Sequence, residues 1–110
     1  LMILCHGGND FLRKKDIGKM ESNLRTMINL AESKDIPVVL LGVPKPGLFL
    51  SSAEVYKKIA ESSKVIFIED LVADVLSDSS LKSDTVHPNK DGYRVMAETI
   101  YSVLKDKGAL

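Results

Sequence analysis

The chain has 110 residues, of which 45% are hydrophobic and 27% are charged, as is ordinary for one small globular domain. Fifteen basic residues balance fifteen acidic ones, so no basic stripe indicates nucleic acid, and no apolar run reaches the roughly 20 residues that span a bilayer. The single cysteine, Cys5, excludes an internal disulfide and identifies no compartment.

Apolar runs alternate with amphipathic stretches from the first residue onward. Residues 1–5 form a continuous apolar run that ends at two glycines, which predicts a buried parallel strand followed by a loop. Apolar side chains then recur at helical spacing over residues 18–33. A second strand is predicted over residues 37–43, with its proline at the first position.

The second half of the chain repeats this alternation. A short helix is predicted over residues 53–61, a third buried strand over 65–68 and a short helical piece over 71–76. The last helix is expected over residues 91–107, with one face formed by Tyr93, Met96, Ala97, Ile100, Val103 and Leu104. The resulting β-α-β-α-β-α order predicts an α/β fold, a parallel sheet with helices on both faces.

Two segments with unusual chemistry are expected at the carboxyl ends of the strands, where functional loops of such sheets lie. The first is Gly7-Gly8-Asn9-Asp10, directly after the first strand. Glycine lets the backbone approach a ligand closely, and an asparagine amide can donate to a developing oxyanion. An ordinary turn is the alternative, because these residue types are common turn formers.

The second segment is Asp84-Thr85-Val86-His87, which precedes the last helix. A carboxylate three residues before a histidine can hydrogen bond the imidazole and fix its tautomer, as in a general base with its orienting partner. The alternative is a surface histidine beside a capping aspartate. The spacing alone does not decide between the two.

Residues 84–98 as a whole closely resemble the last motif block of the SGNH/GDSL hydrolase family, D-x-x-H-P-N followed by G-Y and a closing helix. Gly7-Gly8-Asn9-Asp10 resembles the G-x-N-D block of that family, in the right order and separation. The resemblance covers essentially the whole chain, and it is greatest to bacterial arylesterases and lysophospholipase-like acyl-CoA thioesterases. It implies a flavodoxin-like three-layer α/β/α sandwich, here with about three strands.

The resemblance also implies residue roles. His87 becomes the general base, Asp84 its orienting carboxylate, and Asn9 an oxyanion donor with Gly8 beside it. The nucleophile of the family comes from a G-D-S block that has no counterpart in this chain, and none of the eleven serines follows a strand in a nucleophile turn. Because Leu1 lies inside an apolar run, we expect residues 1–110 to be the C-terminal part of one SGNH domain that is nearly inactive by itself.

Other kinds of site find little support. His6-Gly7-Gly8 is similar to the oxyanion loop of α/β-hydrolases, but no G-x-S-x-G elbow is present. Cys5, His6 and His87 lack a fourth ligand at metal-site spacing, and Cys5 is expected to be a small buried hydrophobe. No glycine-rich nucleotide loop occurs, so no cofactor is expected.

The functional expectation is hydrolysis of a small-molecule carboxylic ester or thioester. Deacetylation of a carbohydrate is a rival substrate choice, and a non-catalytic flavodoxin-like binding domain is the rival from another class. The first strand is expected to expose a bare parallel edge, through which the chain could form a homo-oligomer.

Overall fold

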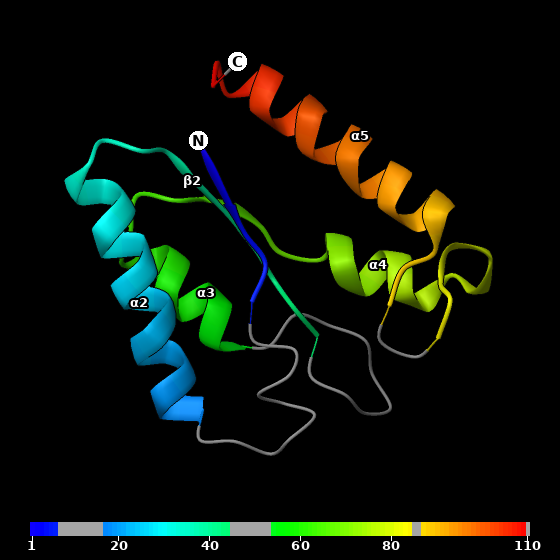
Figure 1. The fold of residues 1–110 in the computed structure, drawn as a ribbon, viewed down its shortest axis with the longest axis horizontal. Coiled ribbons are helices and arrows are strands. Elements are labelled where there is room, and N and C mark those ends of the chain that lie inside the picture. The colour runs from blue at the N-terminus through cyan, green and yellow to red at the C-terminus, as the bar shows by residue number, and fades with distance from the viewer. Residues whose placement is uncertain (7–16, 45–53, 85–86, 110) are drawn as a thin grey trace.

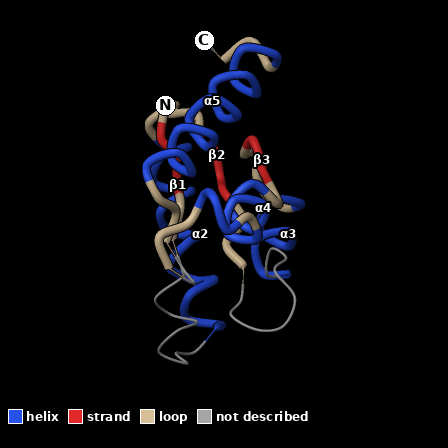
Figure 2. The backbone as a smooth tube through the Cα atoms, turned by 90° about the vertical axis from the view of Figure 1, so that its right-hand side faces the viewer, coloured by secondary structure: helices blue, strands red, loops and turns tan. Residues whose placement is uncertain are grey.

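The structure is a computed structural model, and it describes residues 1–6, 17–44, 54–84 and 87–109. A parallel sheet of three strands forms its centre, in the order β1-β2-β3 (Figure 1). The strands are β1 (Met2–Leu4), β2 (Val38–Leu41) and β3 (Ile66–Ile68). Figure 2 shows them side by side across the middle of the molecule.

The helices form a layer on each face of this sheet. One layer consists of α2 (Ile17–Ser33) and α3 (Glu54–Glu61). The other consists of α4 (Leu71–Ser77) and α5 (Lys90–Asp106), with the short 3₁₀ helix η1 (Ser79–Leu81) between them. The expected three-layer α/β/α sandwich is therefore confirmed. None of the helices in the described part of the chain has the length and apolar character to cross a membrane.

The central strand β2 organises the core because all four of its residues are buried. Side chains alternate across a strand, so Val38 and Leu40 pack against α2 and α3. Val39 and Leu41 pack against α4 and α5 on the opposite face. The unbroken apolar run of β2 thus reflects burial on both faces, as expected for a parallel strand.

The edge strand β1 is less buried than the sequence pattern predicts. Leu1 and Ile3 are 54% and 50% exposed, so the expectation of a fully buried strand is wrong. Ile3 pairs in register with Val39 but does not belong to the core cluster beneath α4 and α5. An apolar run predicts a strand with two apolar faces, but it does not predict which neighbours cover them.

Helix α5 is also rotated from the expected orientation. Tyr93 is 55% exposed and Ala97 is exposed as well, whereas Ile100 and Leu104 are buried as predicted. The physical reason is Gly92, which is buried against the main chain of Leu81. This close approach turns the Gly92 face of the helix inward and Tyr93 outward.

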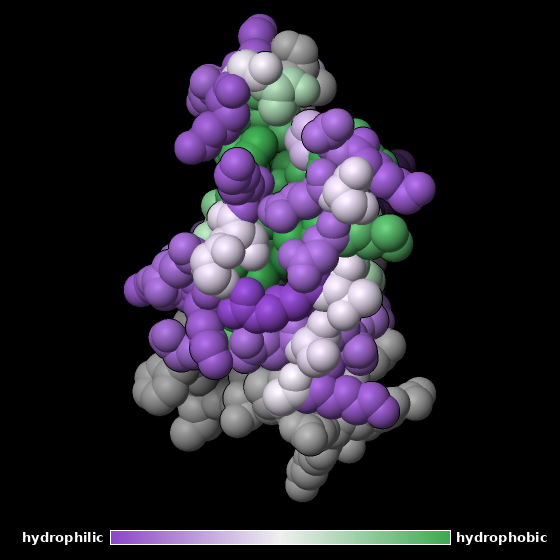
Figure 3. Space-filling model, turned by 90° about the vertical axis from the view of Figure 1, so that its left-hand side faces the viewer, coloured by the Kyte–Doolittle hydropathy of each residue, from purple (hydrophilic) through white to green (hydrophobic). Residues whose placement is uncertain are grey.

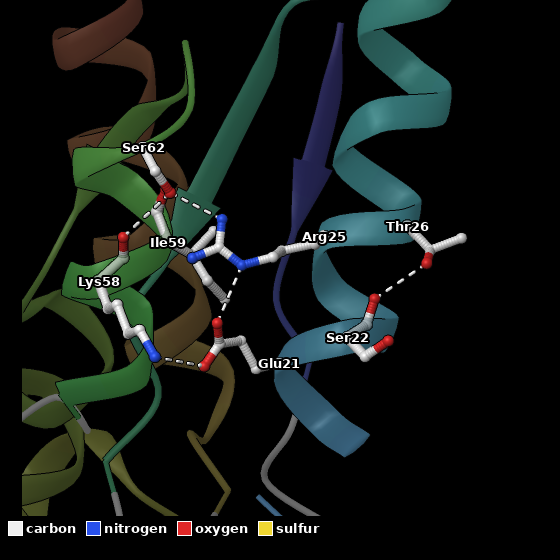
Figure 4. A network of polar contacts seen from close by, with 7 residues as sticks. All are labelled: Glu21, Ser22, Arg25, Thr26, Lys58, Ile59 and Ser62. Atoms are coloured by element: carbon white, nitrogen blue, oxygen red, sulfur yellow. Dashed lines mark hydrogen bonds and ion pairs between the residues drawn. The ribbon is translucent and has the colours of Figure 1, made fainter. Parts of the chain in front are cut away.

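A polar network joins α2 to α3 on the outside of the sandwich (Figure 4). Glu21 accepts from Arg25 Nε at 2.9 Å and pairs with Lys58 Nζ at 3.3 Å, while Arg25 Nη1 donates to Ser62 Oγ at 2.7 Å. Hydrogen bonds from Arg25 and Lys58 lower the pKa of Glu21 below its ordinary value. Figure 3 shows a mainly hydrophilic face with hydrophobic residues between the polar ones, so this network belongs to a solvated exterior.

Candidate functional site

A closed loop between η1 and α5 carries the two ionisable residues of the predicted site. Its two arms are joined by an antiparallel bridge between Lys82 and Pro88. The main-chain N–H of Ser83 donates to the carbonyl of His87 at 2.9 Å. The carboxyl ends of β1 and β2 and the arms of this loop lie toward the same side of the molecule (Figure 1).

Asp84 and His87 are in direct contact at the tip of the loop. The imidazole Nδ1 of His87 lies 2.9 Å from Asp84 Oδ2 and 3.0 Å from Oδ1. The main-chain N–H of His87 also donates to Asp84 Oδ1 at 2.9 Å. One carboxylate therefore holds both the backbone and the ring of the histidine, which fixes how the ring is turned.

This contact also determines the tautomer of the ring. An ionised carboxylate only accepts hydrogen bonds, so Nδ1 of His87 must carry the proton that it shares with Asp84. Nε2 is then the unprotonated nitrogen in the neutral ring, and no residue within the described ranges hydrogen bonds it. The arrangement can accept a proton at Nε2, as a general base does.

The pair is largely open to solvent, since the side chains of His87 and Asp84 are 62% and 57% exposed. Exposed ion pairs contribute only about 0–1 kcal/mol to folding stability. The carboxylate therefore orients the ring and adds little to stability.

Asn9 and Gly8, the predicted oxyanion residues, lie outside the described residues. The structure does describe His6, which precedes them, and it ties this residue to α3. The hydroxyl of Tyr56 donates to the carbonyl of His6 at 2.5 Å. Tyr56 is fully buried, and the sequence indicated only its place on the inner face of a helix. Helical periodicity cannot reveal the partner of its hydroxyl.

We expect Tyr56→Phe to lower the free energy of unfolding by about 1 kcal/mol, because it removes one hydrogen bond and keeps the packing. Urea denaturation of both proteins measures this difference. Tyr93→Phe is the matched control, since Tyr93 is 55% exposed and should give no measurable change. Equal stability of Tyr56→Phe and the unmodified chain would show that the bond to His6 does not hold the end of β1.

Two serines near the candidate pair donate hydrogen bonds to the main chain. Ser83, the serine closest to His87 in sequence, donates to the carbonyls of His87 and Pro88 at 3.3 and 3.4 Å. Ser77 donates to the carbonyl of Asp74 at 2.8 Å. Neither is positioned as a nucleophile on the imidazole of His87.

Cys5 is exposed, so the expectation that it is a buried hydrophobe is wrong. It follows β1 directly, where the sheet edge is open to solvent. Atoms around the sulfur nevertheless withdraw the thiol from water, and this desolvation raises the pKa of Cys5 above its ordinary value. A thiol held protonated is a poor nucleophile.

No group of three or more potential metal ligands occurs among residues 1–6, 17–44, 54–84 and 87–109. His6 and Cys5 are described, and they belong to no such group.

Residues 1–95 match the model of the GDSL-like lipase/acylhydrolase family. Among solved structures, the psychrotrophic esterase EstA from Pseudoalteromonas sp., inhibited by monoethylphosphonate, is 20% identical over 98% of this chain, with a TM-score of 0.79. TesA is 26% identical over 96% of this chain, with a TM-score of 0.78. A mutant of esterase AlinE4 is 24% identical over 97%, with a TM-score of 0.62.

The same alignments cover only part of the other proteins. This chain spans 62% of EstA, 62% of TesA and 58% of AlinE4. No match to the chain was found among curated proteins. The family model thus identifies the family, the solved structures show the fold, and each of these three structures extends beyond what the chain covers.

Proposed function

The chain belongs to the GDSL-like lipase/acylhydrolase family, and we propose that it supplies the general base of a serine-type carboxylic ester or thioester hydrolase. In this proposal His87 is the base, Asp84 its orienting carboxylate and Asn9, beside Gly8, an oxyanion donor. The activities proposed for the whole enzyme are those of an arylesterase, an acyl-CoA thioesterase or a lysophospholipase. The nucleophilic serine is provided by polypeptide outside these 110 residues.

The observation that carries the proposal is the bond from His87 Nδ1 to the Asp84 carboxylate at 2.9 Å. It leaves Nε2 as the proton acceptor, and a base must hold its proton-accepting nitrogen in one orientation. The backbone N–H of His87 also donates to this carboxylate, as it would to a capping aspartate, so the bond to the ring nitrogen is the one that supports the role of a base.

The proposed roles give the following chemistry. The serine oxygen attacks the acyl carbonyl carbon, and its proton passes to Nε2 of His87. The carbonyl becomes an oxyanion, and when it re-forms, the alcohol or thiol leaves with the proton from Nε2. Water then attacks the acyl-enzyme, again giving its proton to Nε2, which returns it to the serine as the acid is released. Asp84 stabilises the imidazolium at each stage.

Asn9 is proposed to donate its amide to the oxyanion, with Gly8 allowing the backbone to approach the substrate. The bond from Tyr56 to the carbonyl of His6 supports this role, because it anchors the chain three residues before Asn9. Loss of one such donor costs about 10²–10³ in rate.

The open edge of β1 is proposed to pair with a further parallel strand, from the polypeptide that bears the serine. The exposed Leu1 and Ile3 support this, since covering them removes apolar surface from water. EstA and TesA also extend well beyond the region that this chain covers. A dimer of the isolated chain in light scattering would instead favour a homo-oligomer through β1.

We expect the 110-residue chain alone to hydrolyse p-nitrophenyl esters no faster than a few times background, because loss of the nucleophile costs about 10⁶ in kcat. The measurement is release of p-nitrophenol by the purified chain, with imidazole at the same concentration as a control for simple base catalysis. Turnover well above that control would require a nucleophile within the chain and would overturn the expectation.

The substrate class is tested with the protein from its native source, assayed on p-nitrophenyl acetate, phenyl acetate, a long-chain acyl-CoA thioester, a lysophospholipid and an acetylated xylan. Preference for any of the first four identifies the class of ester or thioester. Preference for the xylan would replace the proposal by carbohydrate deacetylation. No turnover of any of them would favour the non-catalytic binding domain.

A further inference from the structure

Asn89 connects both ends of the loop that carries Asp84 and His87. Its main-chain N–H donates to the carbonyl of Leu81 at 2.9 Å. Its side-chain Nδ2 donates to the carbonyls of Ser80 at 2.9 Å and Lys82 at 3.5 Å. A single residue thus binds three consecutive carbonyls on the incoming arm of the loop.

The same side chain fixes the outgoing arm. Asn89 is the N-cap of α5, and its Oδ1 accepts from the main-chain N–H of Gly92 at 2.9 Å. Its main-chain carbonyl accepts from the N–H of Tyr93 at 2.9 Å. A capping residue needs only an acceptor, so Ser or Asp would cap this helix about as well as Asn. The Nδ2 donor of the amide is not needed for the cap, and it binds carbonyls of the incoming arm instead.

Only asparagine both caps α5 and donates to the carbonyls of the incoming arm from this position. An aspartate would keep the cap, but it would place a carboxylate against the carbonyls of Ser80 and Lys82. A serine would keep the cap with a side chain too short to bind either carbonyl. An asparagine at this position therefore closes the loop as well as capping the helix.

We infer that Asn89 is a positioning residue for the Asp84–His87 pair. It lies two residues after His87, and its bonds to Ser80, Leu81 and Lys82 bring the two arms together beside the Lys82–Pro88 bridge. Closure of the arms acts directly beside the pair, because the main-chain N–H of Ser83, next to Asp84, donates to the carbonyl of His87 at 2.9 Å. The consequence for catalysis rests on the proposed function, whereas the positioning itself does not.

The test is nuclear magnetic resonance of the ring nitrogens of His87 at alkaline pH, in the unmodified chain and in Asn89→Asp and Asn89→Ser. The unmodified chain should show one tautomer, protonated at Nδ1. Both variants should shift toward a mixture of tautomers, because the ring loses its fixed acceptor. Asp84→Asn marks the shift that is produced when the acceptor itself is changed.

Matched controls separate positioning from general destabilisation. Ile100→Val weakens the packing of α5 without touching the loop, and it should keep the tautomer of the unmodified chain. In the unmodified chain, the Nδ2 protons of Asn89 should exchange with water more slowly than those of Asn23 and Asn29, which are exposed on α2. This second measurement needs no variant to fold.

The outcomes are distinct. Unchanged ring shifts in folded Asn89 variants, or Nδ2 exchange as fast as in Asn29, would overturn the inference whatever the enzyme does. If the ring shifts change but hydrolysis by the native protein does not depend on His87, the positioning stands and the proposed function fails. If both hold, Asn89→Ser should lower kcat of the native enzyme by up to about 10²-fold with little change in KM.

Discussion

Replacing His87 with alanine in the native, serine-bearing protein is expected to lower kcat for ester hydrolysis by about 10⁶-fold. Without the imidazole no group takes the proton of the serine, so the nucleophile stays a neutral alcohol. The loss corresponds to about 8 kcal/mol of transition-state stabilisation, at 1.36 kcal/mol for each tenfold change. Steady-state kinetics on a p-nitrophenyl ester measures it.

Two further variants make this result specific. Asp84→Asn should lower kcat by about 10⁴-fold, since an amide can hold the ring in the wrong tautomer. Glu98→Gln is the matched charge-removing control, because Glu98 is exposed on α5 away from the loop tip, and its activity should equal that of the unmodified enzyme. More than a few per cent of activity in His87→Ala would show that another residue is the base.

Gly92→Ala is expected to lower the free energy of unfolding by about 2 kcal/mol. A Cβ at this position would lie 2.1 Å from the carbonyl oxygen of Leu81 and 2.9 Å from Cβ of Pro88. The first of these neighbours is main chain, so the contact is relieved only by moving α5 from η1. Overpacking of this kind costs about 3 kcal/mol, whereas the helix propensity of alanine returns only about 1 kcal/mol.

Urea denaturation followed by circular dichroism measures this loss, and Gly108→Ala is its matched control. Gly108 has a φ of +71° and no atom within 4 Å of an added Cβ. Its replacement should therefore cost only the strain of a left-handed residue, about 1 kcal/mol. A Gly92→Ala chain as stable as the unmodified one would show that α5 does not approach η1 this closely.

The fold was largely predictable because the periodicity of apolar residues is a local property. The four apolar residues of β2 and the inward face of α3, with Val55, Tyr56 and Ile59, lie as the pattern indicates. Exposure at Ile3 and Tyr93 was not predictable, since it depends on which element covers a face. The exposure of Tyr93 results from the contact between Gly92 and a main-chain carbonyl. A hydropathy pattern does not reveal such a contact.

The contact between Asp84 and His87 was predictable from sequence spacing, whereas their catalytic roles remain predictions. The spacing of Asp84 and His87 indicated that they could touch, and the structure brings them within 2.9 Å. The contacts of Asn89 were not predictable, because sequence spacing does not indicate which carbonyls meet a side-chain amide seven or nine residues later. The roles of Asn9 and Gly8 remain predictions from the family resemblance.

We propose that this chain carries the base of a serine hydrolase and that the nucleophile lies outside it. Labelling of the native protein with a fluorophosphonate probe, followed by intact mass spectrometry, tests this most directly. We predict one covalent adduct, on a serine in a species heavier than 12.1 kDa, and slower labelling in His87→Ala. A native species of 12.1 kDa that stays unlabelled would contradict the account and favour a binding domain.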